Sequence, residues 1–79
     1  MTHHLYLYND NEHSFKYVYT AIIEILGHLP LQAEQCCLIA DQNGKCQVKE
    51  SDDILEIQKF KQKFEEFNLK VEILDKNYA

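Results

Sequence analysis

The apolar and polar positions in the first half of the chain follow two different periods. In the run Leu5–Tyr8 the leucines share one face and the tyrosines the other, as in a strand. Apolar residues then recur at helical spacing over Ser14–Leu26, with a serine at the N-cap and Gly27 just past the last turn. Pro30 suits a first helical turn, and a second helix is predicted over Leu31–Gln42.

The second half repeats both periods. Lys45–Lys49 alternates between polar and apolar residues and predicts a half-exposed strand with its lysines on the wet face. Ser51-Asp52-Asp53 places acidic groups at the start of a third helix, which Asn68 closes, and Lys70–Leu74 predicts a last strand. Small side chains form a narrow stripe on the second helix and indicate close packing against another helix or a ligand: Ala33, Cys36, Cys37 and Ala40.

The order of elements is therefore β-α-α-β-α-β, in one domain that spans residues 1–79 with a core at about 5–74. So short a chain predicts an α+β fold with a three-stranded antiparallel sheet and the helices stacked on one face. Six apolar residues that recur at strand or helix spacing are expected in the core: Leu7, Val18, Ile22, Ile57, Phe60 and Phe64.

Charge and cysteine usage narrow the classes of partner. The formal net charge of −5 argues against nucleic acid or an anionic membrane as a partner and is compatible with a cationic ligand. No stretch approaches the roughly 20 apolar residues of a membrane span, and the first residues lack the features of a signal peptide. The three cysteines are odd in number and form no CxxC pair, which predicts buried thiols in a reducing cytoplasm.

The sequence contains no nucleophile elbow, P-loop or HExxH motif, so we expect a non-enzymatic protein without a cofactor or metal. Its densest polar segment runs from Tyr8 to Phe15, where the first strand must turn into a helix. Asn and Asp side chains suit such a turn by themselves. One alternative is a metal-dependent enzyme that uses Asp10, His13 and Asp41, although these three residues have no diagnostic spacing.

Three motifs in this order resemble the ClpS family, the adaptors of the Clp proteases in the N-degron pathway. Asn9-Asp10 follows the first strand, where the family has Asn-Asp and a further acidic residue. Ala33-Glu34-Gln35 lies in the second helix, and Asp41–Lys45 matches a family pattern of His, two variable residues, Gly and Lys. The resemblance covers about residues 5–74.

The resemblance implies a binding function. ClpS proteins bind substrates whose first residue is Phe, Tyr, Trp or Leu and dock on a Clp AAA+ unfoldase of the ClpA or ClpC type. Asn9 and Asp10 match the positions that hold the substrate α-ammonium group, and Asp41 stands where the family has a histidine contact. The first side chain of the substrate would then enter a pocket between the first two helices, lined by Phe15, Val18, Ile22, Cys37 and Ala40.

The chain departs from the family pattern at three places. Asp41 replaces the histidine, and Asn11 replaces the second acidic residue of the turn. We expect only Met1–His4 before the first strand, where the family carries a tail needed for delivery, so delivery would fail or use a different unfoldase. The alternative function is a structural protein–protein interaction domain without degron binding, for which the C-terminal domain of the ribosomal stalk protein offers a precedent by analogy.

Overall fold

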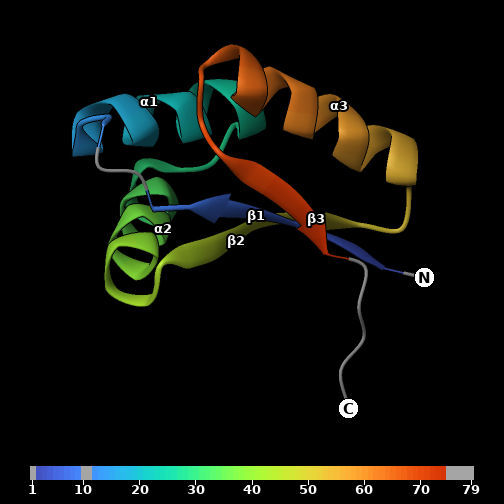
Figure 1. Ribbon diagram of the computed structural model, residues 1–79, viewed down its shortest axis with the longest axis horizontal. Helices are drawn as coiled ribbons and strands as arrows, with labels where there is room; N and C mark the ends of the chain where they lie inside the picture. Colours follow the sequence, from blue (N-terminus) through green and yellow to red (C-terminus); the bar gives the residue numbers. More distant parts are fainter. Residues whose placement is uncertain (1, 10–11, 75–79) are drawn as a thin grey trace.

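The computed structural model describes residues 2–9 and 12–74 of the chain. The observed order is the predicted β-α-α-β-α-β, and the three strands form one antiparallel sheet in the order β2-β1-β3, so the fold class is confirmed (Figure 1). The elements are β1 (His3–Tyr8), α1 (Phe15–Leu26), α2 (Pro30–Asn43), β2 (Lys45–Ser51), α3 (Ile54–Glu66) and β3 (Val71–Leu74).

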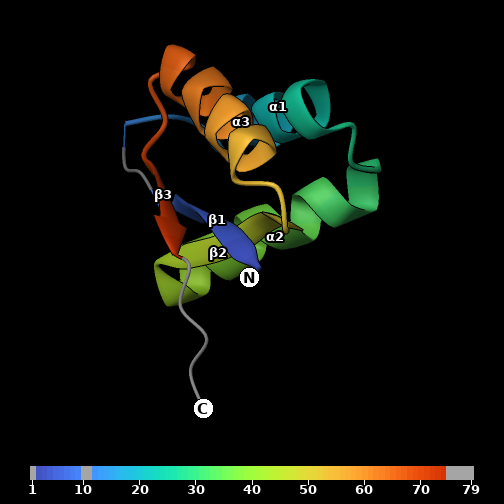
Figure 2. The same ribbon diagram turned by 90° about the vertical axis from the view of Figure 1, so that its right-hand side faces the viewer.

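The strands bury one face of the sheet. On the central strand β1, Leu5 and Leu7 have no more than 1% of their surface exposed, whereas the tyrosines between and after them are half-buried. Helices α1 and α3 lie side by side over the sheet, and α2 packs against α1 and β2 (Figure 2). The sheet therefore carries its helices on the leucine face, as the alternation of Leu and Tyr predicts.

Four of the six residues predicted as core are almost completely buried: Leu7, Ile22, Ile57 and Phe64. Val18 and Phe60 are half-buried and pack against that cluster from its edge. The partial exposure of Val18 has a structural cause, because it faces a cavity between α1 and α2.

The first strand begins earlier than the sequence pattern indicates. His3 and His4 belong to β1 and pair with Ser51 and Glu50 of β2, so the expectation that they precede the strand is wrong. Polar residues at a strand end carry no alternation signal, and pairing with a neighbouring strand is what extends the element.

A register shift between Leu5 and Tyr6 also changes which side of the sheet Lys49 occupies. Leu5 pairs with Lys49, but Tyr6 pairs with Gln47, so β2 has one extra residue at this point. Cross-strand partners share a face, which puts Lys49 on the helix side with its Nζ 5.6 Å from the centre of the Phe60 ring. The prediction that Lys49 lies on the wet face is therefore wrong.

Among the described residues, none of the helices is both long and apolar enough to cross a membrane.

Candidate binding pocket

The end of β1 is held between two other parts of the fold. The backbone N–H of Tyr8 donates to the carbonyl of Lys70 (3.0 Å), and the N–H of Asn9 donates to the carbonyl of Gly44 (2.8 Å). Gly44 has a φ of 89° in the turn that joins α2 to β2, a conformation that Gly adopts without steric cost. These bonds bring Asn9 next to the C-terminal end of α2.

A cavity of about 200 Å³ opens at this junction. It is smaller than the roughly 300–1,000 Å³ of a site for a drug-sized ligand, so it suits a single side chain. β1 and the residues that follow it, the first turns of α1, and the second half of α2 supply its walls: Leu7, Tyr8, Asn9, His13, Phe15, Val18, Cys37, Ala40 and Asp41.

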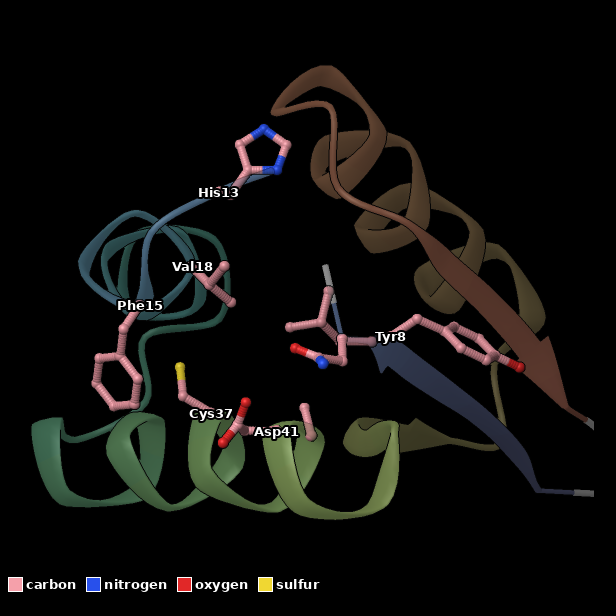
Figure 3. A pocket seen from close by; sticks show the side chains of 9 residues that line it. Tyr8, His13, Phe15, Val18, Cys37 and Asp41 are labelled. Atoms are coloured by element: carbon pink, nitrogen blue, oxygen red, sulfur yellow. The ribbon is translucent and has the colours of Figure 1, made fainter. Parts of the chain in front are cut away.

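The structure brings most of the residues predicted for the site into one pocket. Asn9 and Asp41 line it together with Phe15, Val18, Cys37 and Ala40. Figure 3 shows Cys37 and Asp41 on α2 facing Val18 of α1 across the cavity.

Two of the predicted residues do not line the described pocket. Ile22 has none of its surface exposed and belongs to the core one turn after Val18, so its assignment to the pocket is not supported. The spacing of an apolar helix stripe cannot separate its core end from its pocket end. Asp10 lies outside the described residues.

The buried part of the pocket wall on α2 is neutral. Ala40 and Cys37 are buried, and burial together with the charge of Cys36 raises the pKa of Cys37 to about 11, which keeps this thiol uncharged at neutral pH. Phe15 stands at the rim with 49% of its surface exposed and stacks on Tyr19 at 6.4 Å between ring centres. Its ring therefore leaves the cavity open.

Oxygen acceptors gather at the mouth of the pocket. Asp41 lies in the last turn of α2, a turn without any basic side chain to offset the negative end of the helix dipole. The amide of Asn9 lies at the exposed end of β1. A carboxylate, an amide oxygen and the end of a helix dipole together favour a cationic group at this point.

His13 was expected to be a solvent-exposed turn residue that could also touch a ligand, and it was not among the predicted site residues of the adaptor; the structure places it in the lining of the cavity. Its ring stacks on Tyr17 at 4.7 Å between centres, and the Tyr17 hydroxyl donates to the carbonyl of Phe67 at the end of α3 (2.7 Å). His13 is thus packed on α1, and Tyr17 in turn links α1 to the end of α3. The only sequence signal for this contact was the i, i+4 spacing of two rings, which cannot indicate a pocket.

The tyrosine ring at the end of β1 points away from the cavity (Figure 3). The Tyr8 hydroxyl donates to Glu72 Oε1 at 3.0 Å, on the side of the sheet opposite the helices. Tyr8 contributes to the pocket through its position in the strand, and its phenol is not available to a ligand there.

In the described part of the chain, no three His, Cys, Asp or Glu side chains are grouped so that they could hold a metal ion. The fold and the pocket define a small α+β domain with an apolar cavity beside exposed carboxylate and amide oxygens. The family model described as "ATP-dependent Clp protease adaptor protein ClpS" matches residues 1–72, and the chain belongs to this family. A comparison with curated proteins finds no match. The protein is therefore an adaptor of the Clp protease system.

Proposed function

We propose that the pocket binds the first residue of substrate proteins that begin with Phe, Tyr, Trp or Leu, and that the domain presents them to a Clp AAA+ unfoldase of the ClpA or ClpC type. The observation that carries this proposal is the pairing of a neutral cavity of about 200 Å³ with carboxylate and amide oxygens at its mouth. A free N-terminal residue with an apolar side chain has the matching chemistry, because its α-ammonium group is bonded to the same Cα atom that carries the side chain.

The α-ammonium group offers three donors and one positive charge. Asp41 and Asn9 supply two acceptors, and Asp10 follows Asn9 in the sequence at the position where the family holds the ammonium. A hydrogen bond to a carboxylate is stronger than one between neutral groups, so the two acidic residues would provide most of the specificity for an unblocked N-terminus.

The apolar part of the pocket supports a preference for rings. The family often has Met and Val at the positions of Cys37 and Ala40, and both residues here are smaller. If the backbone keeps its place, an aromatic side chain fills this space better than Leu, and each methylene left unfilled forfeits about 0.8 kcal/mol of burial. Hence Phe, Tyr and Trp are the expected first residues, ahead of Leu.

Unfoldase docking requires a soluble partner in the same compartment, which we place in the cytoplasm. Three free thiols are compatible with that reducing environment. The negative net charge of the chain is compatible with a basic docking surface on the unfoldase.

A peptide titration tests the binding function. Fluorescent peptides identical except for a first residue of Phe, Trp, Leu or Ser are titrated with the protein, and each is compared with its N-acetylated form. The aromatic peptides should bind most tightly, Leu more weakly, and Ser and all acetylated peptides should show no binding. Absence of binding by every peptide to a folded protein would favour the structural interaction domain instead.

A further inference from the structure

Helix α2 is apolar on two opposite sides. Its inner side carries small buried residues: Ala33, Cys37 and Ala40. Leu31 and Leu38 each precede a buried alanine by two positions, which on a helix is about 200° around the axis. Both leucines therefore lie on the outer side, where 64% and 45% of their surfaces are exposed. The helix itself lies at the periphery of the molecule and packs against β2 and α1 (Figure 1).

The outer side of α2 forms a straight row that contains no charged residue. Its members follow the spacing of the a and d positions in a coiled-coil seam, and we call them the α2 row: Leu31, Gln35, Leu38 and Gln42. Two more large apolar side chains lie next to the row and are exposed, Leu29 at the N-cap and Ile39 beside Leu38. The row therefore presents apolar surface along the length of the helix.

The outer side of α3 shows the usual alternative. The positions of α3 that precede its buried residues Ile57 and Phe64 in the same way, and those that continue that line, are Leu55, Lys59, Gln62 and Glu66. There the exposed leucine has charged neighbours, as is normal for a helix surface in water. A helix that is apolar on both sides is typical of one whose outer side is covered by another surface.

We propose that the α2 row is a docking surface for an amphipathic helix of a partner protein, with apolar side chains toward the two leucines and lysine or arginine side chains along one edge. Glu34 and Asp41 are exposed, lie about two helical turns apart and border the row on the same long edge. The sequence of α2 contains no basic residue. Cationic side chains that flank the seam of the partner helix would face these carboxylates, as flanking charges do in coiled coils.

The same charges disfavour a second copy of this chain as the occupant. Two α2 rows packed antiparallel would set one acidic edge against the other, and the formal net charge of −5 adds to the repulsion. A helix with basic flanks has attraction in place of both repulsions. Asp41 also lines the pocket, so Glu34 is the residue through which the edge is tested.

The experiment titrates the full chain with a synthetic probe, an N-acetylated peptide of about three heptads with Leu at the a and d positions and Lys at the flanking positions. Acetylation removes the α-ammonium group, so binding of the probe is independent of the proposed degron function. A control peptide has the same composition in an order that spreads its leucines around the helix. We expect saturable one-to-one binding of the probe, with amide chemical-shift changes centred on the α2 row, and at least roughly tenfold weaker binding of the control peptide.

Substitutions separate the apolar and the charged parts of the surface. The double variant Leu31→Gln with Leu38→Gln keeps the net charge and should weaken probe binding by at least roughly tenfold. Leu55→Gln is the matched control, because it removes an exposed leucine from α3, and it should leave the affinity unchanged. Glu34→Gln should weaken binding by roughly two- to fivefold and reduce its dependence on salt.

Equal binding of the two peptides, equal affinities of wild type and the folded double variant, or no binding of the probe would each overturn the proposal. Dimerisation of the chain alone in sedimentation equilibrium, if the double variant abolished it, would also overturn the proposal, because the occupant would then be a second copy. The comparison of the two peptides uses wild-type protein only, so it decides the question even where a variant does not fold.

Discussion

At the scale of single residues, recognition depends on a few polar atoms at the pocket mouth. Asp41 is the most informative of them, because the family has a histidine at this position. A histidine can offer a neutral acceptor, whereas Asp41 brings a full negative charge to a helix end that already carries negative potential. The electrostatic part of ligand binding should therefore be larger here than with the family residue.

The first prediction is that Asp41→Asn weakens binding of a Phe-initiated peptide. The change keeps the shape and exchanges a charged hydrogen bond for a neutral one, a difference of about 1 kcal/mol or roughly fivefold in Kd. Titrations at low and high salt provide the readout, because the wild-type affinity should depend more strongly on salt than that of the variant. Equal affinities and equal salt dependence would remove Asp41 from the ammonium site.

The second prediction is that Asp10→Ala has a larger effect. Loss of a charge-assisted contact costs about 1.5–3 kcal/mol, or roughly 10- to 150-fold in affinity. Glu66→Ala is the matched control, because it removes an acidic side chain from the exposed end of α3. Affinities of Asp10→Ala and wild type within twofold of each other, with both proteins folded, would refute the assignment.

The third prediction concerns the width of the pocket. Ala40→Val adds two carbons to a buried part of the pocket wall and should shift the preference from Phe toward Leu. The ratio of the Leu to the Phe affinity should rise by roughly fourfold for each methylene of better contact, which corresponds to about 0.8 kcal/mol. Ile39→Val, at an exposed position of the same helix, should leave the ratio of the two affinities unchanged. An unchanged Leu-to-Phe ratio in Ala40→Val would mean that this wall does not contact the ligand.

At the scale of elements, the turn after α2 couples helix termination to the placement of the site. Gly44 ends α2, donates its N–H to the carbonyl of Ala40 (2.8 Å), and accepts from Asn9. One residue thus sets both the direction of β2 and the position of the β1 end. Gly27 ends α1 in the same way, because its N–H donates to the carbonyl of Ile23 (2.9 Å). Ile23 does not line the pocket, so Gly27 has no comparable link to the site.

This contrast supplies a fourth prediction, with a built-in control. Gly44→Ala and Gly27→Ala should each destabilise the fold by about 1–2 kcal/mol, because both glycines have positive φ, which disfavours a residue with a side chain. An added Cβ would meet no atom within 4 Å at either position, so the backbone conformation is the whole cost in both variants. Only Gly44→Ala should also weaken peptide binding, since it disturbs the acceptor of the Asn9 N–H. Urea unfolding and peptide titration measure the two effects, and equal losses of binding in both variants would contradict a specific role of the Gly44 turn.

At the scale of the whole molecule, one small core supports both the sheet and the pocket. Phe64 of α3 is completely buried among side chains from every layer of the fold. The Tyr17 hydroxyl donates to the carbonyl of Phe67 and so ties the same end of α3 to α1, and the ring of His13 stacks on Tyr17. A change in the core should therefore reach the pocket through stability.

The fifth prediction is that Phe64→Ala destabilises the fold by about 3–5 kcal/mol, a large share of the roughly 5–15 kcal/mol available to a domain. Leu55→Ala on the same helix, at a side chain 71% exposed, should change stability by no more than about 0.5 kcal/mol. The midpoints of urea unfolding curves report both effects, provided that the dependence of the unfolding free energy on urea concentration is the same in all proteins. A Phe64→Ala midpoint equal to that of wild type would contradict the central place of Phe64 in the core.

The sequence by itself determined the element order, the helix ends at Gly27 and Gly44, and four of the thirteen apolar residues that are buried in the described part of the chain. Periodicity and capping are local properties, and burial of one face reinforces them. The sequence also indicated six of the nine pocket-lining residues, but through family resemblance, since spacing alone could not assign them. Tertiary structure decided what depends on neighbours from distant segments. Strand pairing places His3 and His4 in β1 and puts Lys49 on the same side of the sheet as Phe60. Helix packing buries Ile22 in the core, whereas Val18, one turn earlier, lines the cavity. No period along the chain encodes the distance between two elements, so these placements arise only when the elements pack together.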